Sequence, residues 1–342
     1  MTRMRKLKTR PKKKVSSEAV SQVLDNEVTG RFVGMNPRQS TFMLHFIVLI
    51  FGFTGILGKL ISLEAERLVF WRVLLGGGLV AIWLLLRGRV QRFKLEMLWK
   101  VGLVGCVAAA HWIAFFASIK VSNVSVALAT LATTPVFVSV LEPIIYRRRF
   151  DPKELILGLV IILGLGILLW GPSPDGPLAD ASRYYKGVGL ALVSAALAAI
   201  FATLNGVLVK SYDSANLTRV ELLSAALALA ALFVVQGKGR VPAFWQVPSD
   251  DWLWIGLLAT LATAFAFLMS IEVMKNLTPF TTAVAINLEP VYAIVLAALI
   301  FGEEERMGGG FYLGASIIVG AVFVDAWLKR RAKTNTAGHI KH

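Results

Sequence analysis

Ten long apolar stretches fill the chain between residues 42 and 328, and short polar or charged segments separate them. Most come near the ~20 residues that a helix needs to cross about 30 Å of hydrocarbon, although the fifth and seventh are short. A bilayer offers no water to backbone polar groups, so we predict that each stretch is a transmembrane α-helix. The predicted spans are residues 42–60, 68–86, 97–119, 121–146, 155–170, 188–209, 217–235, 252–274, 279–301 and 308–328.

The second half of this pattern repeats the first. A shift of 155 residues places Lys120 on Lys275 and Pro135 on Pro290, and matched glycines follow at a shift of 156. Each half holds five spans, and an odd number of spans gives two copies opposite orientations in the bilayer, as is typical of secondary transporters. We therefore expect an all-α integral membrane protein with ten transmembrane helices in two inverted-topology five-helix repeats.

The repeats divide the chain into five parts. The longest connectors, around residues 171–187 and 236–251, are rich in Gly, Pro and mixed charge and are predicted to be surface loops. The expected parts are a basic, disordered cytoplasmic arm (residues 1–40), a first repeat (41–170), an external linker (171–187), a second repeat (188–328) and a basic cytoplasmic tail (329–342).

Composition agrees with a membrane protein. The chain is 56% hydrophobic and 17% charged, with a mean hydropathy of +0.67, which is too apolar for a soluble protein of 342 residues. The net charge of +15 would suit a nucleic-acid partner, but most Lys and Arg lie in the N-terminal arm, the loops after even-numbered spans and the tail. By the positive-inside rule, this predicts a plasma (inner) membrane protein with both termini in the cytoplasm and no nucleic-acid partner.

The N-terminal arm has a run of Lys and Arg from Arg3 to Lys14, with no apolar region near enough to form a cleavable signal peptide. Anionic lipid headgroups attract such an arm by about 1 kcal/mol for each nearby cation. The bilayer and its anionic lipids are therefore expected partners. The oligomeric state, including a homodimer, stays open.

Glu289 is the polar side chain that most requires an explanation. It lies in the middle of the ninth span, where a charge costs on the order of 2.5–3.5 kcal/mol to insert. Pro290 follows it directly and leaves the carbonyl of residue 286 without its helical donor. A carboxylate beside a distorted helix should face a cavity rather than lipid, so Glu289 is our candidate for a proton-titrating or cation-binding group.

The equivalent point of the fourth span carries hydroxyl groups. Thr130 and Thr134 share one helical face just before Pro135, and Thr282, Glu289 and Tyr292 share a face of the ninth span in the same way. Two Pro-interrupted spans at corresponding positions of inverted halves indicate a central substrate site, which would include Pro135 and Pro290. The alternative is that both prolines only bend their helices for packing.

Three other polar residues are candidates. Arg72 lies early in the second span, near enough to Glu64, Glu66 or the outer headgroups to serve as an orienting anchor. His111 is a lone imidazole in the third span, for which a hydrogen-bonded core role competes with a relay or ligand role. Asn205 is placed to face a central cavity from the sixth span.

Catalytic motifs are absent. The sequence has no HExxH, G-x-S-x-G, Walker or Gly-rich dinucleotide motif, and its single cysteine and four histidines do not form a metal-ligand pattern. We therefore expect neither an enzyme nor a protein with a cofactor or metal site.

Ten spans in two copies, a basic connector after the fourth span, and Leu288-Glu289-Pro290 followed by Gly302-Glu303 resemble the EamA family of the drug/metabolite transporter superfamily. The resemblance covers about residues 42–328. It implies a secondary transporter, or exporter, of small metabolites such as amino acids that works by alternating access, and it implies a structural or gating role for Arg72. In place of an acidic residue at the end of the fourth span, this chain has Tyr146-Arg147-Arg148-Arg149, so no such role carries over.

Two alternatives to the metabolite transporter remain. A flippase for a lipid-linked sugar would need a lateral opening and a larger hydrophilic chamber. A membrane scaffold that does not transport would have no reason to keep Glu289, Thr134 and two mirrored prolines away from lipid.

Overall fold

The computed structural model describes residues 34–168, 180–286 and 288–338, which form helices and connectors with no β-strand in these ranges. Most of the predicted arm and of the linker between the repeats lies outside the described residues. The α-helices are α2 (Pro37–Leu60), α3 (Ala65–Leu86), α4 (Leu95–Val121), α5 (Val124–Leu131), α6 (Thr134–Tyr146), α7 (Pro152–Leu168), α8 (Ala181–Leu208), α9 (Ser214–Val235), α10 (Asp251–Leu257), α11 (Ala266–Val273), α12 (Pro279–Ile286), α13 (Glu289–Phe301) and α14 (Gly309–Gly338). A π-helix, η3 (Leu258–Phe265), joins α10 to α11, and 3₁₀ turns form η1 (Lys238–Arg240), η2 (Pro242–Trp245) and η4 (Gly302–Glu305).

All ten predicted spans are helical, which confirms the all-α class. Within the described part of the chain, eight helical segments are long and apolar enough to cross a membrane. The helices at the fifth and tenth predicted spans do not meet that standard: α7 has 17 residues, and the apolar part of α14 runs only from Gly309 to Ala321. The chain is a multi-pass helical protein, and the count of ten spans stays a prediction.

The first helix begins earlier than the apolar pattern predicts. Asn36 accepts a hydrogen bond from the Gln39 amide while the Gln39 side chain accepts one from the Asn36 amide, which forms a capping box. Pro37 takes the first helical position, where its missing N–H costs nothing. Four residues assigned to the arm from hydropathy alone, 37–40, therefore belong to α2.

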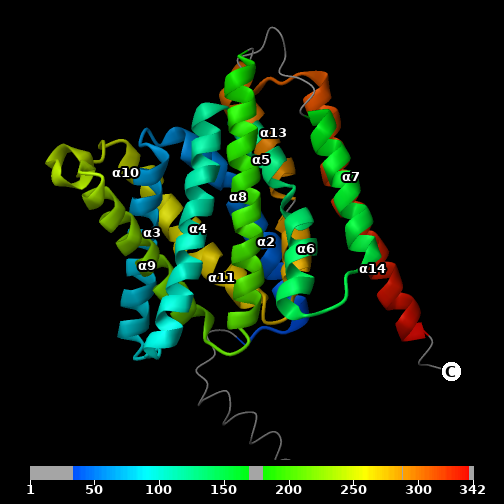
Figure 1. The fold of residues 1–342 in the computed structure, drawn as a ribbon, viewed down its shortest axis with the longest axis horizontal. Coiled ribbons are helices and arrows are strands. Elements are labelled where there is room, and N and C mark those ends of the chain that lie inside the picture. Colours follow the sequence, from blue (N-terminus) through cyan, green and yellow to red (C-terminus); the bar gives the residue numbers. More distant parts are fainter. Residues whose placement is uncertain (1–33, 169–179, 287, 339–342) are drawn as a thin grey trace, which may run out of the picture. The chain divides into compact units, whose positions relative to one another are not determined.

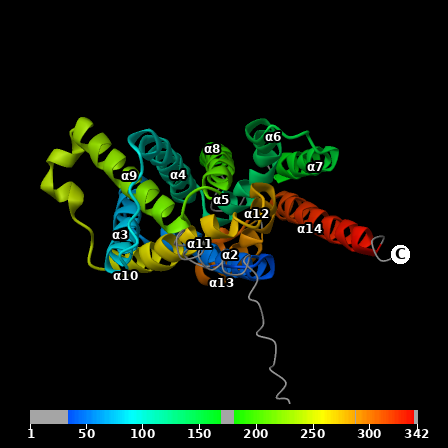
Figure 2. The ribbon, with the colours of Figure 1, turned by 90° about the horizontal axis from the view of Figure 1, so that it is seen from below.

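The two halves of the chain interleave. In the centre, α4 of the first half packs on α8 and α9 of the second, and α2 packs on α11 and α13 (Figure 1). The view from below shows α3, α9 and α10 to one side and α6, α7 and α14 to the other (Figure 2). The central helices therefore bring side chains from both halves together.

Glycines permit the closest of these contacts. A Cβ on Gly105 of α4 would lie 2.1 Å from the carbonyl oxygen of Glu221 on α9. A Cβ on Gly76 of α3 would lie 2.8 Å from a methyl carbon of Thr263 in η3. Small residues let helix backbones approach in this way, and close packing is a main source of helix association in a bilayer.

The fourth and ninth predicted spans are each broken in two, as their prolines predict. Pro135 is the second residue of α6, directly after the break from α5, and Pro290 is the second residue of α13, directly after the break from α12. Proline is tolerated in the first turn of a helix but not in its interior, so each span restarts as a new helix at this point. Thr134 and Glu289 occupy the matching first positions.

Candidate functional site

A cavity of about 120 Å³ lies where the two broken spans meet the central helices. Its walls come from both halves of the chain: α2 to α6 on one side, and α8 with α11 to α13 on the other. Six residues that the sequence singled out line it, namely Arg72, His111, Thr134, Thr282, Glu289 and Pro290.

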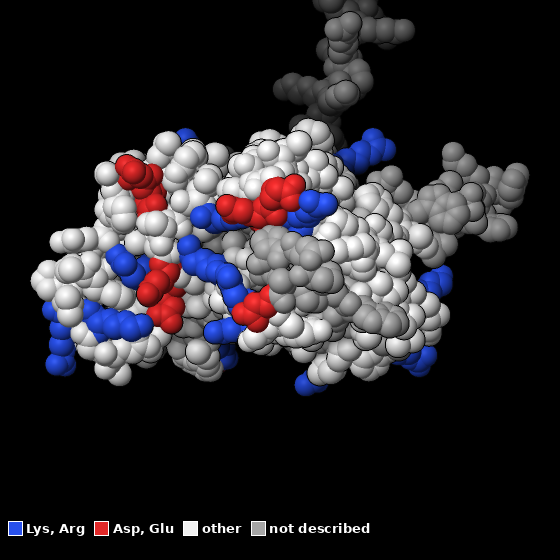
Figure 3. Space-filling view, turned by 90° about the horizontal axis from the view of Figure 1, so that it is seen from above, with Lys and Arg blue, Asp and Glu red and all other residues white. Residues whose placement is uncertain are grey.

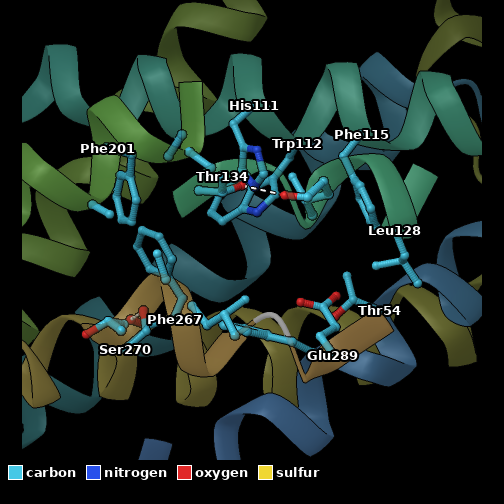
Figure 4. Close-up of a pocket in the computed structure, with 18 of the residues that line it drawn as sticks. Thr54, His111, Trp112, Phe115, Leu128, Thr134, Phe201, Phe267, Ser270 and Glu289 are labelled. Atoms are coloured by element: carbon cyan, nitrogen blue, oxygen red, sulfur yellow. Dashed lines mark hydrogen bonds between the residues drawn. The ribbon is translucent and has the colours of Figure 1, made fainter. Parts of the chain in front are cut away.

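Glu289 points into this cavity from the first position of α13. Its side chain lies with its oxygens toward Thr54 of α2 (Figure 4), and the residue is 5% exposed. No described residue forms a hydrogen bond or an ion pair with the carboxylate, and the Thr54 hydroxyl is likewise buried without a partner among them. The carboxyl group is therefore available to a substrate or a proton.

His111 is held by the protein rather than by Glu289. Its Nδ1 lies 3.0 Å from the Ser194 carbonyl oxygen and 2.8 Å from the Ser194 hydroxyl, and its ring stacks on Phe115. Figure 4 shows His111 and Glu289 on opposite sides of the cavity. His111 and Glu289 are therefore not paired with each other in this structure.

The interpretation of Arg72 as an anchor near Glu64, Glu66 or the headgroups is wrong. Because α3 begins at Ala65, Arg72 lies about two turns into the helix, where it is 1% exposed. Its Nε donates to the Thr263 hydroxyl at 3.0 Å, and its guanidinium lies 4.2 Å from the centre of the Trp112 ring. Nη1 is buried without a hydrogen-bond partner among the described residues.

The π-helix η3 explains how Thr263 reaches Arg72. The Thr263 hydroxyl donates to the carbonyl of Leu258, five residues earlier, at 2.8 Å. It can then accept the hydrogen bond from Arg72, and the absence of a Cβ at Gly76 leaves it room. Short π-helical segments occur frequently at functional sites. Nothing in the apolar pattern of the eighth span signalled this one.

The rest of the cavity is mainly apolar and aromatic. Phe51, Trp112, Phe115, Phe201 and Phe267 contribute ring surface from four helices. Among the lining residues, the ionisable side chains are the carboxyl of Glu289, the guanidinium of Arg72 and the imidazole of His111. An apolar pocket with a few convergent polar groups suits a small amphipathic solute.

Four of the predicted site residues lie outside this lining. Tyr292 is 42% exposed on the outer side of α13, beside Gly52, because it follows the cavity-facing Glu289 and Pro290 by less than one turn. Thr130 and Pro135 are buried in the packing around the break in the fourth span. Asn205 is fully buried on α8, about one turn after the lining residues Phe201 and Ala202.

A buried carboxylate that the sequence did not single out lies at the N-terminus of α5, one turn before the lining residue Leu128. Glu305 of η4 accepts hydrogen bonds from the Val124 amide (3.2 Å), the Ser125 amide (2.9 Å) and the Ser125 hydroxyl (2.7 Å), at the N-terminus of α5. Lys59 at the end of α2 donates to the same carboxylate at 3.0 Å. We call this cluster the Glu305 seal. The end of the molecule that holds the α2–α3 connector shows acidic and basic side chains intermixed (Figure 3).

A matching cluster lies at the N-terminus of α12. Glu142 of α6 accepts a hydrogen bond from the Phe280 amide at 3.0 Å, and Phe280 corresponds to Ser125 by the 155-residue shift. Arg148 lies 3.6 Å from Glu142 and 2.7 Å from Glu154. We call this cluster the Glu142 seal. A negative charge at a helix N-terminus is favourable, so the carboxylate of each seal caps the N-terminus of a half-helix of the opposite repeat.

Glu142 lies near the end of the fourth predicted span, where a carboxylate is ordinarily expected only to pair or to snorkel. Its pairing with Arg148 is present, but its contact with α12 was not foreseen because the two residues are 138 positions apart. Glu305 was overlooked because it stands in a run with Glu303 and Glu304, which reads as an exposed loop.

Comparisons with known proteins agree with this architecture. A solved structure titled "Crystal structure of protein" superposes with a TM-score of 0.62 at 18% identity, covering 86% of this chain and 98% of the other, which shows the fold. An uncharacterized transporter, YxxF, of Bacillus subtilis (strain 168) is 20% identical over 78% of this chain and 84% of its own length. An uncharacterized transporter of Clostridium kluyveri is 20% identical over 60% of this chain and 63% of its own.

The family assignment rests on a broader match. The EamA-like transporter family matches the chain twice, over residues 40–170 and 185–325. These two segments contain the broken spans, both seals and the residues that line the cavity. The chain therefore belongs to the EamA-like transporter family, part of the drug/metabolite transporter superfamily.

Proposed function

We propose that this protein is a secondary transporter that exports small metabolites, amino acids or related compounds, across the cytoplasmic membrane by alternating access. The observation that carries the proposal is the cavity between the two Pro-broken spans, which Glu289 and Arg72 both line. The direction of transport is what the family resemblance implies. Membership of a transporter family implies a small-molecule substrate and a lipid environment.

The chemistry of the cavity supports a substrate of the amino-acid kind. Glu289 offers a carboxylate to an ammonium group, and Arg72 has a buried N–H without a partner among the described residues that can donate to a carboxylate. The aromatic wall provides an apolar surface for a side chain. In this proposal Thr134 and Thr282, which line the cavity near the two helix breaks, contribute hydroxyl groups to the substrate site.

Packing between the halves supports inverted repeats. Under the repeat, α2 corresponds to α8, α3 to α9, and α4 to the segment from α10 to α11. The contacts of α4 with α8 therefore correspond to those of α2 with η3 and α11, and the contacts of α4 with α9 correspond to those of α3 with η3. Likewise, the contacts of α5 and α6 with α8 correspond to those of α12 and α13 with α2, and the contact of α5 with α13 corresponds to that of α12 with α6. Two further pairs, α3 with α9 and α7 with α14, join equivalent helices. A structure with two related halves can expose a central site first to one side and then to the other.

The two seals support the same mechanism. Each places a carboxylate from near the end of the fourth span of one repeat on the N-terminus of a half-helix of the other, and the contacts of both are formed in this structure. In our proposal the two seals lie at the two ends of the transport pathway. In our proposal, opening the Glu142 seal admits substrate from the cytoplasm and opening the Glu305 seal releases it outside, with both termini cytoplasmic.

The alternatives fit the cavity less well. A lipid-linked sugar would require a large hydrophilic chamber, whereas this cavity is about 120 Å³ and largely apolar. A scaffold has no use for a buried carboxylate and a buried guanidinium that both face an internal space, each of which is costly in a bilayer.

Counterflow in proteoliposomes tests the proposal. Labelled amino acids, nucleosides and sugars are offered to the wild type and to Glu289→Gln, with and without a pH gradient. We expect saturable exchange of an amino-acid substrate that Glu289→Gln abolishes, because the ammonium group loses its carboxylate partner. Exchange of the same substrate by both proteins, with the same rate and pH dependence, would remove Glu289 from the mechanism, and no exchange by folded protein would contradict the proposal.

A further inference from the structure

Outside the cavity, a second carboxyl group is buried without a partner. Glu221 of α9 is 0% exposed, and neither of its oxygens has a hydrogen-bond partner among the described residues. The side chain of Asn205 on α8 lies close enough to interact with it, although the two groups do not meet hydrogen-bond geometry. Asn205 is also 0% exposed, and both of its amide atoms lack partners among these residues.

The packing around Glu221 is built to exclude water. Gly105 of α4 brings that helix against the α9 backbone at Glu221, because a Cβ there would overlap the Glu221 carbonyl group. Helix α4 also packs along α8, so α4, α8 and α9 enclose the carboxyl and the amide together. Asn205 follows the cavity residues Phe201 and Ala202 by one turn of α8, so this pocket lies next to the cavity wall.

No described cation neutralises Glu221. Helix α3, which packs on α9, carries Arg72, but its guanidinium contacts Thr263 and Trp112. Helix α11, which also packs on α9, carries Glu272, but this carboxylate is bound by Ser214 and Lys275. Helix α4 carries Cys106 beside Gly105 and His111, which is held by Ser194. Its charged groups lie near the helix ends, where Glu96 pairs with Lys100 and Lys120 donates to the Ile61 carbonyl. On α9 itself, Arg219 donates to the Gln91 carbonyl near the helix end.

An ionised carboxylate in this pocket would be uncompensated, and an isolated buried charge costs several kcal/mol. A carboxylic acid fits better, because its O–H can donate to the carbonyl oxygen of an amide while its own carbonyl oxygen accepts from the amide N–H₂. The geometry points to a proton-binding site formed by Glu221 and Asn205, separate from the substrate cavity. We propose that this site carries the coupling proton.

The inference rests on the proposed transport function for its consequence. In the packing seen here the Glu221 carboxyl holds its proton against Asn205. When α4 and α9 separate as one side opens, water reaches the pocket, the O–H bond breaks heterolytically, and water accepts the proton. Because Asn205 and the cavity residues share α8, the same helix movement changes access to both sites.

Infrared difference spectroscopy tests the proton site without any substrate. Spectra of the purified full-length protein at neutral pH are compared for the wild type, Glu221→Gln and Asn205→Leu. We expect a protonated-carboxyl band in the wild type that is missing in Glu221→Gln and shifted in Asn205→Leu, where the amide partner is lost. A wild-type spectrum identical to that of Glu221→Gln in this region would overturn the proposal.

Transport measurements test the coupling. We expect Glu221→Gln to retain counterflow of the labelled amino acid while its accumulation driven by a pH gradient falls to the level measured without a gradient. Glu272→Gln is the matched control, because it removes a buried carboxylate that already has partners, and it should keep gradient-driven accumulation. Gradient-driven accumulation by Glu221→Gln equal to the wild type would overturn the coupling role.

The two tests fail in different ways. If no amino acid is exchanged by the wild type, the proposed function fails while the infrared comparison still decides whether Glu221 binds a proton. If exchange is present but the protonated band is absent, the proposed function stands and the proton site does not.

Discussion

Replacing Glu305 by Gln weakens one seal while changing few atoms. Glu305 is fully buried and holds the Val124 and Ser125 amides, the Ser125 hydroxyl and the Lys59 ammonium within 3.2 Å. A glutamine keeps one carbonyl acceptor, but it loses the negative charge and places an N–H₂ group against these donors. We therefore expect the seal, and with it the occluded state, to be destabilised.

The size of the effect follows from the contacts that are lost. A hydrogen bond to a charged group contributes about 1.5–3 kcal/mol, and an anion at a helix N-terminus adds about 0.3–1 kcal/mol. Allowing for the interactions that Gln keeps, the net loss is about 2 kcal/mol. By the relation of about 1.4 kcal/mol per decade, the population open on this side should rise roughly 30-fold.

The assay is the labelling rate of a cavity cysteine. Ala283, which lines the cavity, is changed to Cys in a Cys106→Ser background, so that it is the only cysteine of the chain. A membrane-impermeant maleimide is then applied to the side that carries Glu305. We expect labelling to be roughly 30-fold faster in Glu305→Gln, in proportion to the open population.

Glu304→Gln is the matched control. Glu304 also lies 3.0 Å from Lys59, but its side chain is 70% exposed, and an exposed ion pair contributes only about 0–1 kcal/mol. Its substitution should change the labelling rate by less than about fivefold. Equal rates for both variants and the parent would refute the reasoning, because the Glu305 seal would then not hold the cavity closed.

Three further predictions concern other contacts. Gly105→Ala should lower the free energy of unfolding by about 1–3 kcal/mol, because the added methyl group overlaps the α9 backbone. The control Gly78→Ala should be neutral, because its methyl group meets open space. Thermal unfolding in detergent measures both variants. Arg72→Lys should reduce counterflow at least tenfold, because lysine cannot reproduce the guanidinium contacts with Thr263 and Trp112. Exchange by this variant at the wild-type rate would contradict a role for Arg72 in transport. Glu289→Gln should leave the melting temperature within a few degrees of the wild type, since no described residue pairs with that carboxylate, and a large drop would show a structural role instead.

The sequence predicts local features well because they depend on local chemistry. Apolar runs of the right length become helices wherever they occur, and all ten did. Proline cannot continue a helix, so Pro135 and Pro290 located both breaks, and Glu289 next to the second break was found with them. The placement of Glu289 on the cavity followed from the cost of exposing a carboxylate to lipid.

Contacts between distant segments could not be predicted from the sequence. The Arg72–Thr263 bond depends on a π-helix whose residues look like any apolar span, and it joins positions 191 residues apart. Both seals also join distant segments. The position of Tyr292 was missed because it was placed on the face of Glu289 by a spacing of three residues, which falls short of a full turn of 3.6 residues within α13.

Two-sided access to the cavity tests the central claim most directly. A cysteine at Thr282, in the Cys106→Ser background, is exposed to an impermeant maleimide from each face of sealed proteoliposomes of defined orientation. The account predicts labelling from both faces, with Glu305→Gln favouring one face and Glu142→Gln the other. Labelling from a single face that neither substitution alters, or from neither face, would contradict an alternating-access pathway through this cavity.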